Sequence, residues 1–181
     1  MKKNVLIFGL IAGLISISWA IFAINICYNK ESFEGNVWLG YGSMIVAFSF
    51  IFVGIKNYRD KYNGGVITFG KAFKIGFLIA LIASTIYVVV WMIDFYVFIP
   101  DFMDKYVAHA LAKARASGAS AAEIAKEKES MAGYISMYKS PIGVMLLTYM
   151  EILPVGLVIA LIAALILKRR NKGESPVAVV Q

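Results

Sequence analysis

Two acidic residues inside long apolar segments are the first candidates for chemistry. Asp94 and Glu151 each lie in a stretch that is otherwise almost free of charge. Acids at such positions commonly bind protons, cations or ligands, because a carboxyl in hydrocarbon is costly to keep without a purpose. Two interpretations of Glu151 stay open. It is either an exchangeable proton or cation site, or a neutral carboxyl that fixes helix packing through a hydrogen bond to Asn25, Thr148 or Tyr149.

Pro154 follows Glu151 by three residues and adds to the interest of this position. A proline inside a helix has no amide to donate, and its ring clashes with the carbonyl four residues earlier, here that of Met150. A kink and a carbonyl without its helical donor are therefore expected beside the carboxyl. Together they predict a polar pocket within the membrane.

Asp94 lies about five residues before the end of its apolar segment. On a helical wheel it shares one face with small residues and one tyrosine, namely Gly76, Ala80, Ala83 and Tyr87. Small residues let helices approach closely, so this face is predicted to point at neighbouring helices. The carboxyl then either belongs to a functional site or reaches interfacial water.

The segments that carry these acids define the fold class. The chain has 181 residues, of which 60% are hydrophobic and only 16% are charged, whereas soluble domains are about half apolar and a quarter charged. Four apolar blocks, at about 4–28, 37–55, 72–99 and 142–167, are each long enough for a spanning helix of about 20 residues. The prediction is an all-α integral membrane protein, with residues 1–181 forming a single membrane domain.

The distribution of positive charge predicts the orientation. Cytoplasmic segments of membrane proteins are rich in Lys and Arg, and eleven of the 18 Lys and Arg residues fall at the N-terminus, between block two and the first residues of block three, and after block four. Both termini, including the tail 168–181, are therefore predicted to be cytoplasmic in a multi-pass protein of the cell inner membrane. The net charge of +7 follows this pattern, so no nucleic-acid partner is expected.

The segment 101–141 is the one sizeable part outside the apolar blocks and is predicted to be extracytoplasmic and helical. Ser120 and Glu123 have the spacing of a capping box, in which each side chain binds the other residue's backbone amide. A helix from about Ala121 to Met137 should follow. This segment is either a platform for a partner or lipid, or a solvated connector between the last two spans.

Other motifs favour packing over catalysis. Gly9 and Gly13 form a GxxxG, and Gly156, Ala160 and Ala164 repeat a small residue every four positions, which suits close contact between helices within or between chains. His109 is the one histidine, so neither a metal site nor a cofactor is expected. Neither a nucleophile elbow nor a phosphate-binding glycine loop is present, so an enzyme is not expected.

One longer pattern resembles a known family. The run from Tyr138 to Pro141, the Glu151-x-x-Pro154-x-Gly156 element with the apolar stretch to Lys168, and the stretch from Ile67 to Phe73 are similar to the domain of unknown function 4199. These are small four-helix membrane proteins, chiefly of the Bacteroidota. The resemblance implies four spans in a bacterial inner membrane and brings no activity.

Two functional hypotheses follow. The first is a non-enzymatic structural or accessory membrane protein, with the lipid bilayer and a homo-oligomer or membrane protein as partners. The second is a small oligomeric transporter or channel component with an intramembrane carboxylate site formed by Glu151, Pro154 and Asp94.

Overall fold

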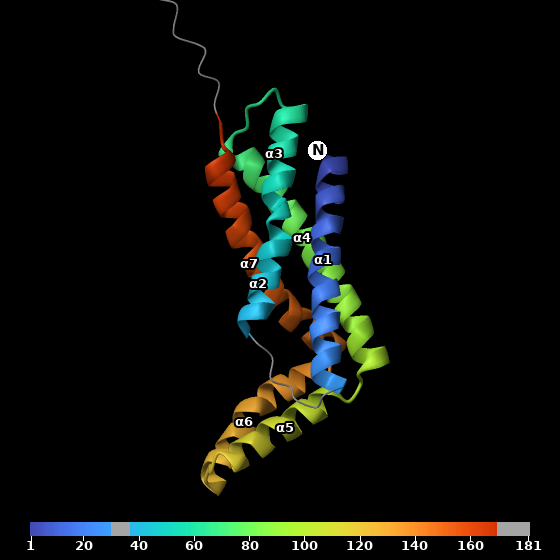
Figure 1. Cartoon of the computed structure of the whole chain (residues 1–181), viewed down its shortest axis with the longest axis vertical. Coiled ribbons are helices and arrows are strands. Elements are labelled where there is room, and N and C mark those ends of the chain that lie inside the picture. Colours follow the sequence, from blue (N-terminus) through green and yellow to red (C-terminus); the bar gives the residue numbers. More distant parts are fainter. Residues whose placement is uncertain (30–36, 170–181) are drawn as a thin grey trace, which may run out of the picture.

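The structure is a computed structural model that describes residues 1–29 and 37–169. The described residues form seven α-helices and one π-helical turn, and contain no β-strand (Figure 1). The elements in chain order are α1 (Lys2–Asn29), α2 (Val37–Phe48), α3 (Phe50–Tyr62), α4 (Phe69–Ile93), η1 (Asp94–Phe98), α5 (Phe102–Ala116), α6 (Ala121–Tyr138) and α7 (Pro141–Leu167).

Four helices are long and apolar enough to cross a membrane, which confirms the predicted fold class. The candidate spans are Lys2–Ile26, Gly40–Tyr62, Phe69–Phe98 and Pro141–Leu167. The second span joins α2 and α3 across a turn residue, Ser49, whose hydroxyl donates to the carbonyl of Val46 at 2.6 Å. α1 begins and α7 ends at the same end of the bundle (Figure 1), as an even number of spans requires.

Two helices extend beyond the apolar blocks that the sequence analysis assigned to the second and third spans. α3 continues past Ile55 to Tyr62, and α4 begins at Phe69, three residues before the predicted block. Tyr58 explains the extension because its ring is buried in the bundle, while the charged residues around it stay nearer the surface. Thr68 begins α4 as its N-cap, since its hydroxyl accepts a hydrogen bond from the amide of Lys71 at 3.4 Å.

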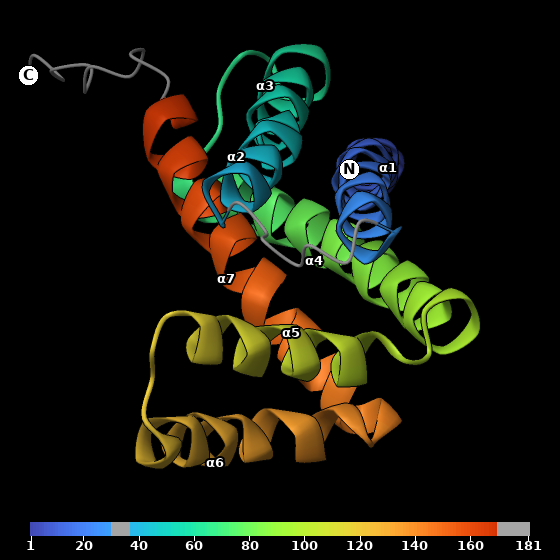
Figure 2. The same cartoon turned by 60° about the horizontal axis from the view of Figure 1, so that its bottom comes forward.

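α4 lies at the centre of the bundle, with α1 on one side and α7 on the other (Figure 2). Glycines make these contacts close. A Cβ on Gly76 would lie 2.9 Å from the Cβ of Ala160, and one on Gly156 would lie 2.9 Å from the Cβ of Ala80. Gly9 is equally tight, since its Cβ would lie 2.7 Å from Cγ2 of Ile82. The predicted small-residue contacts therefore exist, and they join helices of one chain.

A short pairing closes the end of the bundle that holds the N-terminus. Ile67 and Arg169 exchange two backbone hydrogen bonds of 2.9 Å, forming an isolated antiparallel bridge between the α3–α4 loop and the residues after α7. Arg59 also donates to the last carbonyl of α7, that of Leu167, at 3.3 Å. The predicted cytoplasmic tail lies outside the described residues from residue 170 onward, as does most of the segment between the first two predicted spans.

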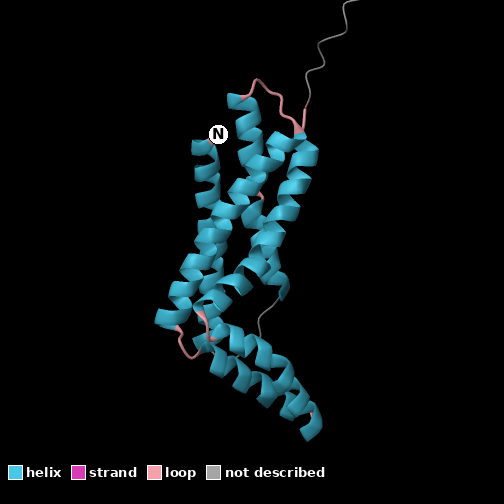
Figure 3. Cartoon of the chain, turned by 180° about the vertical axis from the view of Figure 1, so that it is seen from behind, coloured by secondary structure: helices cyan, strands magenta, loops and turns pink. Residues whose placement is uncertain are grey.

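α5 and α6 lie side by side at the opposite end and project away from the four spans (Figures 1 and 3). We call this pair, residues 102–138, the hairpin. Its second helix begins with the predicted capping box: the Ser120 hydroxyl accepts from the Glu123 amide at 3.3 Å, and Glu123 Oε2 accepts from the Ser120 amide at 2.7 Å. The helix ends at Tyr138, one residue beyond the predicted end. The side of the membrane on which the hairpin lies stays a prediction.

Candidate intramembrane polar site

Glu151 lies deep within the fourth span. It is the eleventh of the 27 residues of α7, which places it about 15 Å along the axis from the start of the helix. Its side chain is exposed on the surface of the bundle. Glu151 therefore lies at the surface of the bundle, which lipid or another protein contacts, and its charge also acts on the phenols of Tyr87 and Tyr138.

The hydrogen bonds predicted for Glu151 are absent. Each candidate partner is engaged elsewhere: Thr148 Oγ1 donates to the Val144 carbonyl at 2.8 Å, Asn25 Nδ2 donates to the Ile21 carbonyl at 2.9 Å, and the Tyr149 hydroxyl is bonded to Thr85 at 2.8 Å. In the described part of the chain Glu151 makes neither a hydrogen bond nor an ion pair. The described structure therefore shows none of the three hydrogen bonds by which Glu151 was predicted to fix packing, because the polar groups of Thr148 and Asn25 bond to carbonyls of their own helices and the Tyr149 hydroxyl bonds to Thr85 of α4.

Pro154 also lies on the exposed surface of α7. The helix runs without interruption from Pro141 to Leu167 through the proline. Since Pro154 has no amide hydrogen, the carbonyl of Met150 lacks its helical donor, and Met150 is 71% exposed. Glu151 and the Met150 carbonyl, which the sequence analysis predicted to form a polar pocket, thus belong to exposed residues of α7.

A continuous exposed surface runs along α7 from this point. We call it the Glu151 face, and it consists of five exposed residues at helical spacing: Glu151, Pro154, Val158, Ile162 and Leu165. The last three are between 44% and 56% exposed. Apart from the carboxyl the face is apolar, as a surface in contact with lipid or with another membrane helix must be.

Asp94 has the opposite environment. It is only 5% exposed, and its Oδ2 is buried without a hydrogen-bond partner among the described residues. It begins the π-helical turn that ends the third span, and its backbone carbonyl accepts from the Ile99 amide at 3.1 Å. π-helical turns frequently occur at functional positions. The predicted inward face is confirmed, since Ala80 and Ala83 are fully buried and Tyr87 is 8% exposed.

Asp94 and Glu151 differ in environment, because Asp94 is buried while Glu151 is exposed, and no hydrogen bond joins them among the described residues. Whether they form one site stays a prediction. Glu151 lies near two phenols, Tyr87 of α4 and Tyr138 at the end of α6. Burial, followed by the charge of Glu151, raises the pKa of Tyr138. Within the described residues no group of three His, Cys, Asp or Glu side chains could hold a metal ion.

Two polar contacts between spans were missed by the sequence analysis. Asn4 is 5% exposed and links α1 to α3, because its Nδ2 donates to the Gly54 carbonyl at 2.9 Å and its Oδ1 accepts from Asn57 Nδ2 at 2.6 Å. Thr85 and Tyr149 join α4 to α7. The signal was the presence of Asn, Thr and Tyr within or beside apolar blocks, since such residues hydrogen-bond across membrane helices.

A second polar cluster attaches the hairpin to α1. The Tyr28 hydroxyl donates to Asp101 Oδ1, and Lys105 Nζ lies 3.1 Å from Asp101 Oδ2 and 4.1 Å from the centre of the Tyr28 ring. The hydrogen bond from Tyr28 is the main cause that lowers the pKa of Asp101, and the interaction with Tyr28, followed by that with Asp101, raises the pKa of Lys105. We call these three residues the Tyr28 cluster.

The fold and this distribution of polar residues define an all-α protein whose four apolar helices are long enough to cross a membrane. Residues 7–169 match the family described as "Protein of unknown function (DUF4199)". The chain belongs to this family, as the Glu151-x-x-Pro154-x-Gly156 element suggested. No curated protein matches the chain, and no solved structure matches it.

Proposed function

We propose that the protein is a non-enzymatic accessory membrane protein that acts by associating, through the Glu151 face, with another membrane-spanning helix. One observation supports this above all others: an acidic residue is exposed about 15 Å along an apolar helix. The acyl chains of lipids offer neither a hydrogen-bond donor nor a charge to such a residue, and acids within spans nearly always face protein or water. A helix from a partner or a second copy would supply the missing donor.

The packing within the chain supports association over transport by a single copy. The contacts of α4 with α1 and α7 are so close that a methyl group on Gly76, Gly9 or Gly156 would collide with the opposite helix. These contacts leave little room for a proton or cation to pass between the helices of the described bundle. The Glu151 face, in contrast, is a surface that the rest of the described chain leaves uncovered.

Site-specific photo-crosslinking in cell membranes tests the proposal. A benzophenone amino acid at Val158 or Ile162 lies on the Glu151 face, whereas the same amino acid at Leu146, which is 48% exposed and lies about 140° around α7 from Glu151, is the matched control. We expect discrete protein adducts from the first two positions and none from Leu146. Equal adducts from both sides, or none from the Glu151 face, would overturn the proposal.

Substitution of Glu151 then identifies the interaction. Glu151→Gln keeps a hydrogen-bonding group and should keep most of the adduct, whereas Glu151→Leu should weaken association about 3- to 30-fold and lower the adduct accordingly, because an interhelical hydrogen bond in membranes contributes about 0.6–2 kcal/mol. Adducts that persist in both variants would remove Glu151 from the interface.

One observation favours a second function, proton or cation movement in an oligomer. Asp94 is buried with an unpaired Oδ2, as an acid at an ion site would be when the site is empty. Flux into liposomes distinguishes the two proposals in the same preparations: a proton or sodium flux that Glu151→Gln or Asp94→Asn removes would favour transport, and its absence in the wild-type protein would favour association.

A further inference from the structure

The hairpin lacks the buried core that a pair of helices normally forms. Among the described residues of α5 and α6 none is buried, although the two helices contain 15 and 18 residues. Most helical stability in proteins comes from packing an apolar face. A hairpin with an apolar interior and no buried residue therefore needs further apolar material against it.

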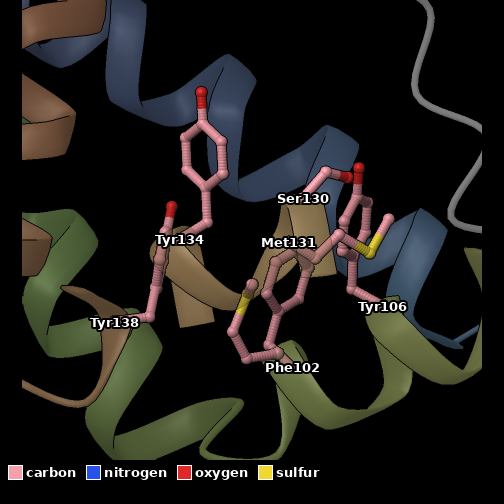
Figure 4. Close-up of a pocket in the computed structure, with 7 residues that line it drawn as sticks. Phe102, Tyr106, Ser130, Met131, Tyr134 and Tyr138 are labelled. Carbon is pink, nitrogen blue, oxygen red and sulfur yellow. The ribbon is translucent and has the colours of Figure 1, made fainter. Parts of the chain in front are cut away.

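A cavity of about 480 Å³ lies between the two helices where that core would be (Figure 4). Its walls are aromatic rings and methionines, from α5 Phe102, Met103 and Tyr106 and from α6 Met131, Tyr134 and Tyr138. This volume lies within the range of about 300–1,000 Å³ that is typical of small-molecule sites, which are largely apolar with a few polar groups. Methionine side chains adapt to irregular apolar ligands.

The base of the cavity is rigid and lies at the end of the spans. Phe102 packs edge-on against Trp91 with ring centres 6.0 Å apart, and Tyr138 packs against Phe95 at 5.4 Å. Trp91 and Phe95 are both buried in the bundle. The wall of the cavity is thus a continuation of the core of the spans.

The position along the chain places this cavity at the border of the bilayer. Phe102 follows the last residue of the third span, Phe98, by four positions, and Tyr138 precedes the first residue of the fourth, Pro141, by three. Tyrosine rings favour this depth because one end is apolar and the other polar. Val97 and Phe98, which are 64% and 67% exposed, give an apolar surface that leads along the chain to Phe102.

We propose that the cavity between α5 and α6 binds one acyl chain of a phospholipid from the adjacent leaflet. The chain enters at the level where the third and fourth spans end and supplies the apolar material that the hairpin lacks. Aromatic and thioether groups contact the methylenes, while the hydroxyls of Tyr106 and Tyr134 remain at the rim, where their rings are 40% and 61% exposed. The proposal rests on the lining of this cavity and not on the exposure of the Glu151 face, although Tyr138, one of the cavity walls, lies near Glu151.

Photo-crosslinking with a phospholipid that carries a diazirine along one acyl chain tests this site. The purified full-length protein is reconstituted in phosphatidylethanolamine–phosphatidylglycerol liposomes that contain this lipid, irradiated, digested and analysed by mass spectrometry. We expect adducts on the cavity walls, at peptides containing Met103 and Met131. Adducts at Met150, which is 71% exposed within the fourth span, report ordinary lipid contact and serve as the internal standard.

Two serines of α6 provide a variant that fills the cavity and its matched control. Ser130 and Ser136 are both exposed on α6, and only Ser130 lines the cavity. Ser130→Leu should fill the cavity and lower the wall adducts several-fold relative to the Met150 standard, whereas Ser136→Leu should leave them unchanged. Equal wall adducts in the two variants would overturn the proposal, because they would show annular lipid only.

A second pair of variants keeps the test valid if the serine variants misfold. Met131→Trp fills the cavity from a wall, and Met137→Trp places the same ring on α6 outside the cavity. Circular dichroism and gel filtration of each variant establish that the fold is intact. Wall positions that remain free of lipid adducts while Met150 is labelled, or that crosslink only to protein, would also overturn the proposal.

Discussion

The four spans and the hairpin are both helical, yet they bury their side chains in opposite ways. α4 alone buries ten residues against its neighbours, whereas neither helix of the hairpin buries any. The spans meet at glycines and alanines, so their backbones approach closely. The hairpin meets through bulky rings and methionines around a cavity. Small residues therefore give the bundle a buried core of its own, and large ones leave the hairpin dependent on what surrounds it.

The same contrast separates the two intramembrane acids. Asp94 lies on the small-residue side of α4 and is buried, whereas Glu151 lies on α7 away from that helix's small residues and is exposed. Burial of an acid in this chain thus depends on whether small residues on the same face bring a neighbouring helix close. The predictions below test each half of the comparison.

The largest expected effect comes from breaking the close contacts of the bundle. Gly76→Ala places a Cβ 2.9 Å from that of Ala160, closer than carbon atoms tolerate, and should destabilise the protein by about 1–3 kcal/mol through overpacking. Thermal unfolding in detergent, followed by circular dichroism, measures the loss. Gly70→Ala is the control on the same helix, because nothing lies within 4 Å of its added Cβ. Equal melting temperatures for the two variants would contradict close packing at Gly76.

A smaller effect is expected at the start of α6. Ser120→Ala removes the hydroxyl that accepts from the Glu123 amide and should cost about 1 kcal/mol of local helix stability. Hydrogen exchange at the amides of Glu123 and Ile124 should become faster, while the amides of α4 keep their protection. Ser136→Ala makes the same chemical change away from the cap. If both variants exchange alike, the capping box does not stabilise the hairpin.

Most of this fold could be predicted from the sequence because its signals are local. Blocks of about 20 apolar residues identify a span without knowledge of its neighbours. The serine and glutamate of the capping box are three residues apart, and both partners are visible in the sequence. The inward direction of Asp94 followed from Gly76, Ala80 and Ala83, which share its face. In each case the deciding residues lie on the same element.

The outward direction of Glu151 was missed for a physical reason. α7 is apolar on all sides, since lipid and the bundle core both accept Leu, Ile and Val, so its hydrophobic pattern does not distinguish a buried face. The positions of the small residues in α7 do indicate which face is buried. The row Gly156, Ala160 and Ala164 leads back to buried Ile152, and Glu151 is one residue, about 100°, away from that row.

The cavity of the hairpin could not be predicted because it depends on contacts between helices. The sequence predicted that segment 101–141 is helical, with a helix from about Ala121 to Met137, but a helix prediction does not show whether two helices pack tightly or leave a space between them. The position of Phe102 depends on Trp91, and that of Tyr138 on Phe95. Distances between residues of different elements follow only from the assembled structure.

The smallest effect is expected at the Tyr28 cluster, because its charged members are exposed to solvent and surface ion pairs stabilise little. The hairpin should nevertheless lose its fixed direction when the cluster breaks. The pKa of Asp101 is lowered from its usual 3.8. The Asp101 carboxylate therefore stabilises the cluster above that pH, and this stabilisation is lost as the pH falls through the lower pKa of the folded state. The pKa of Lys105 is raised from 10.5, so the stabilisation by its ammonium group is lost only as the pH rises above 10.5, through the higher pKa of the folded state.

Spin labels at Ile26→Cys and Ala108→Cys, with Cys27 replaced by Ser, report the distance between α1 and α5 in liposomes. The distribution should be narrow between about pH 4 and 10.5, as the directions of the two shifts require, and should broaden below that window. Tyr28→Phe should broaden it already at neutral pH, because the donor to Asp101 is lost, whereas Tyr96→Phe, on an exposed ring beyond the cluster, should not. A distribution that stays narrow in Tyr28→Phe would mean that the spans alone fix the hairpin, and the two regions would then be less independent than their packing indicates.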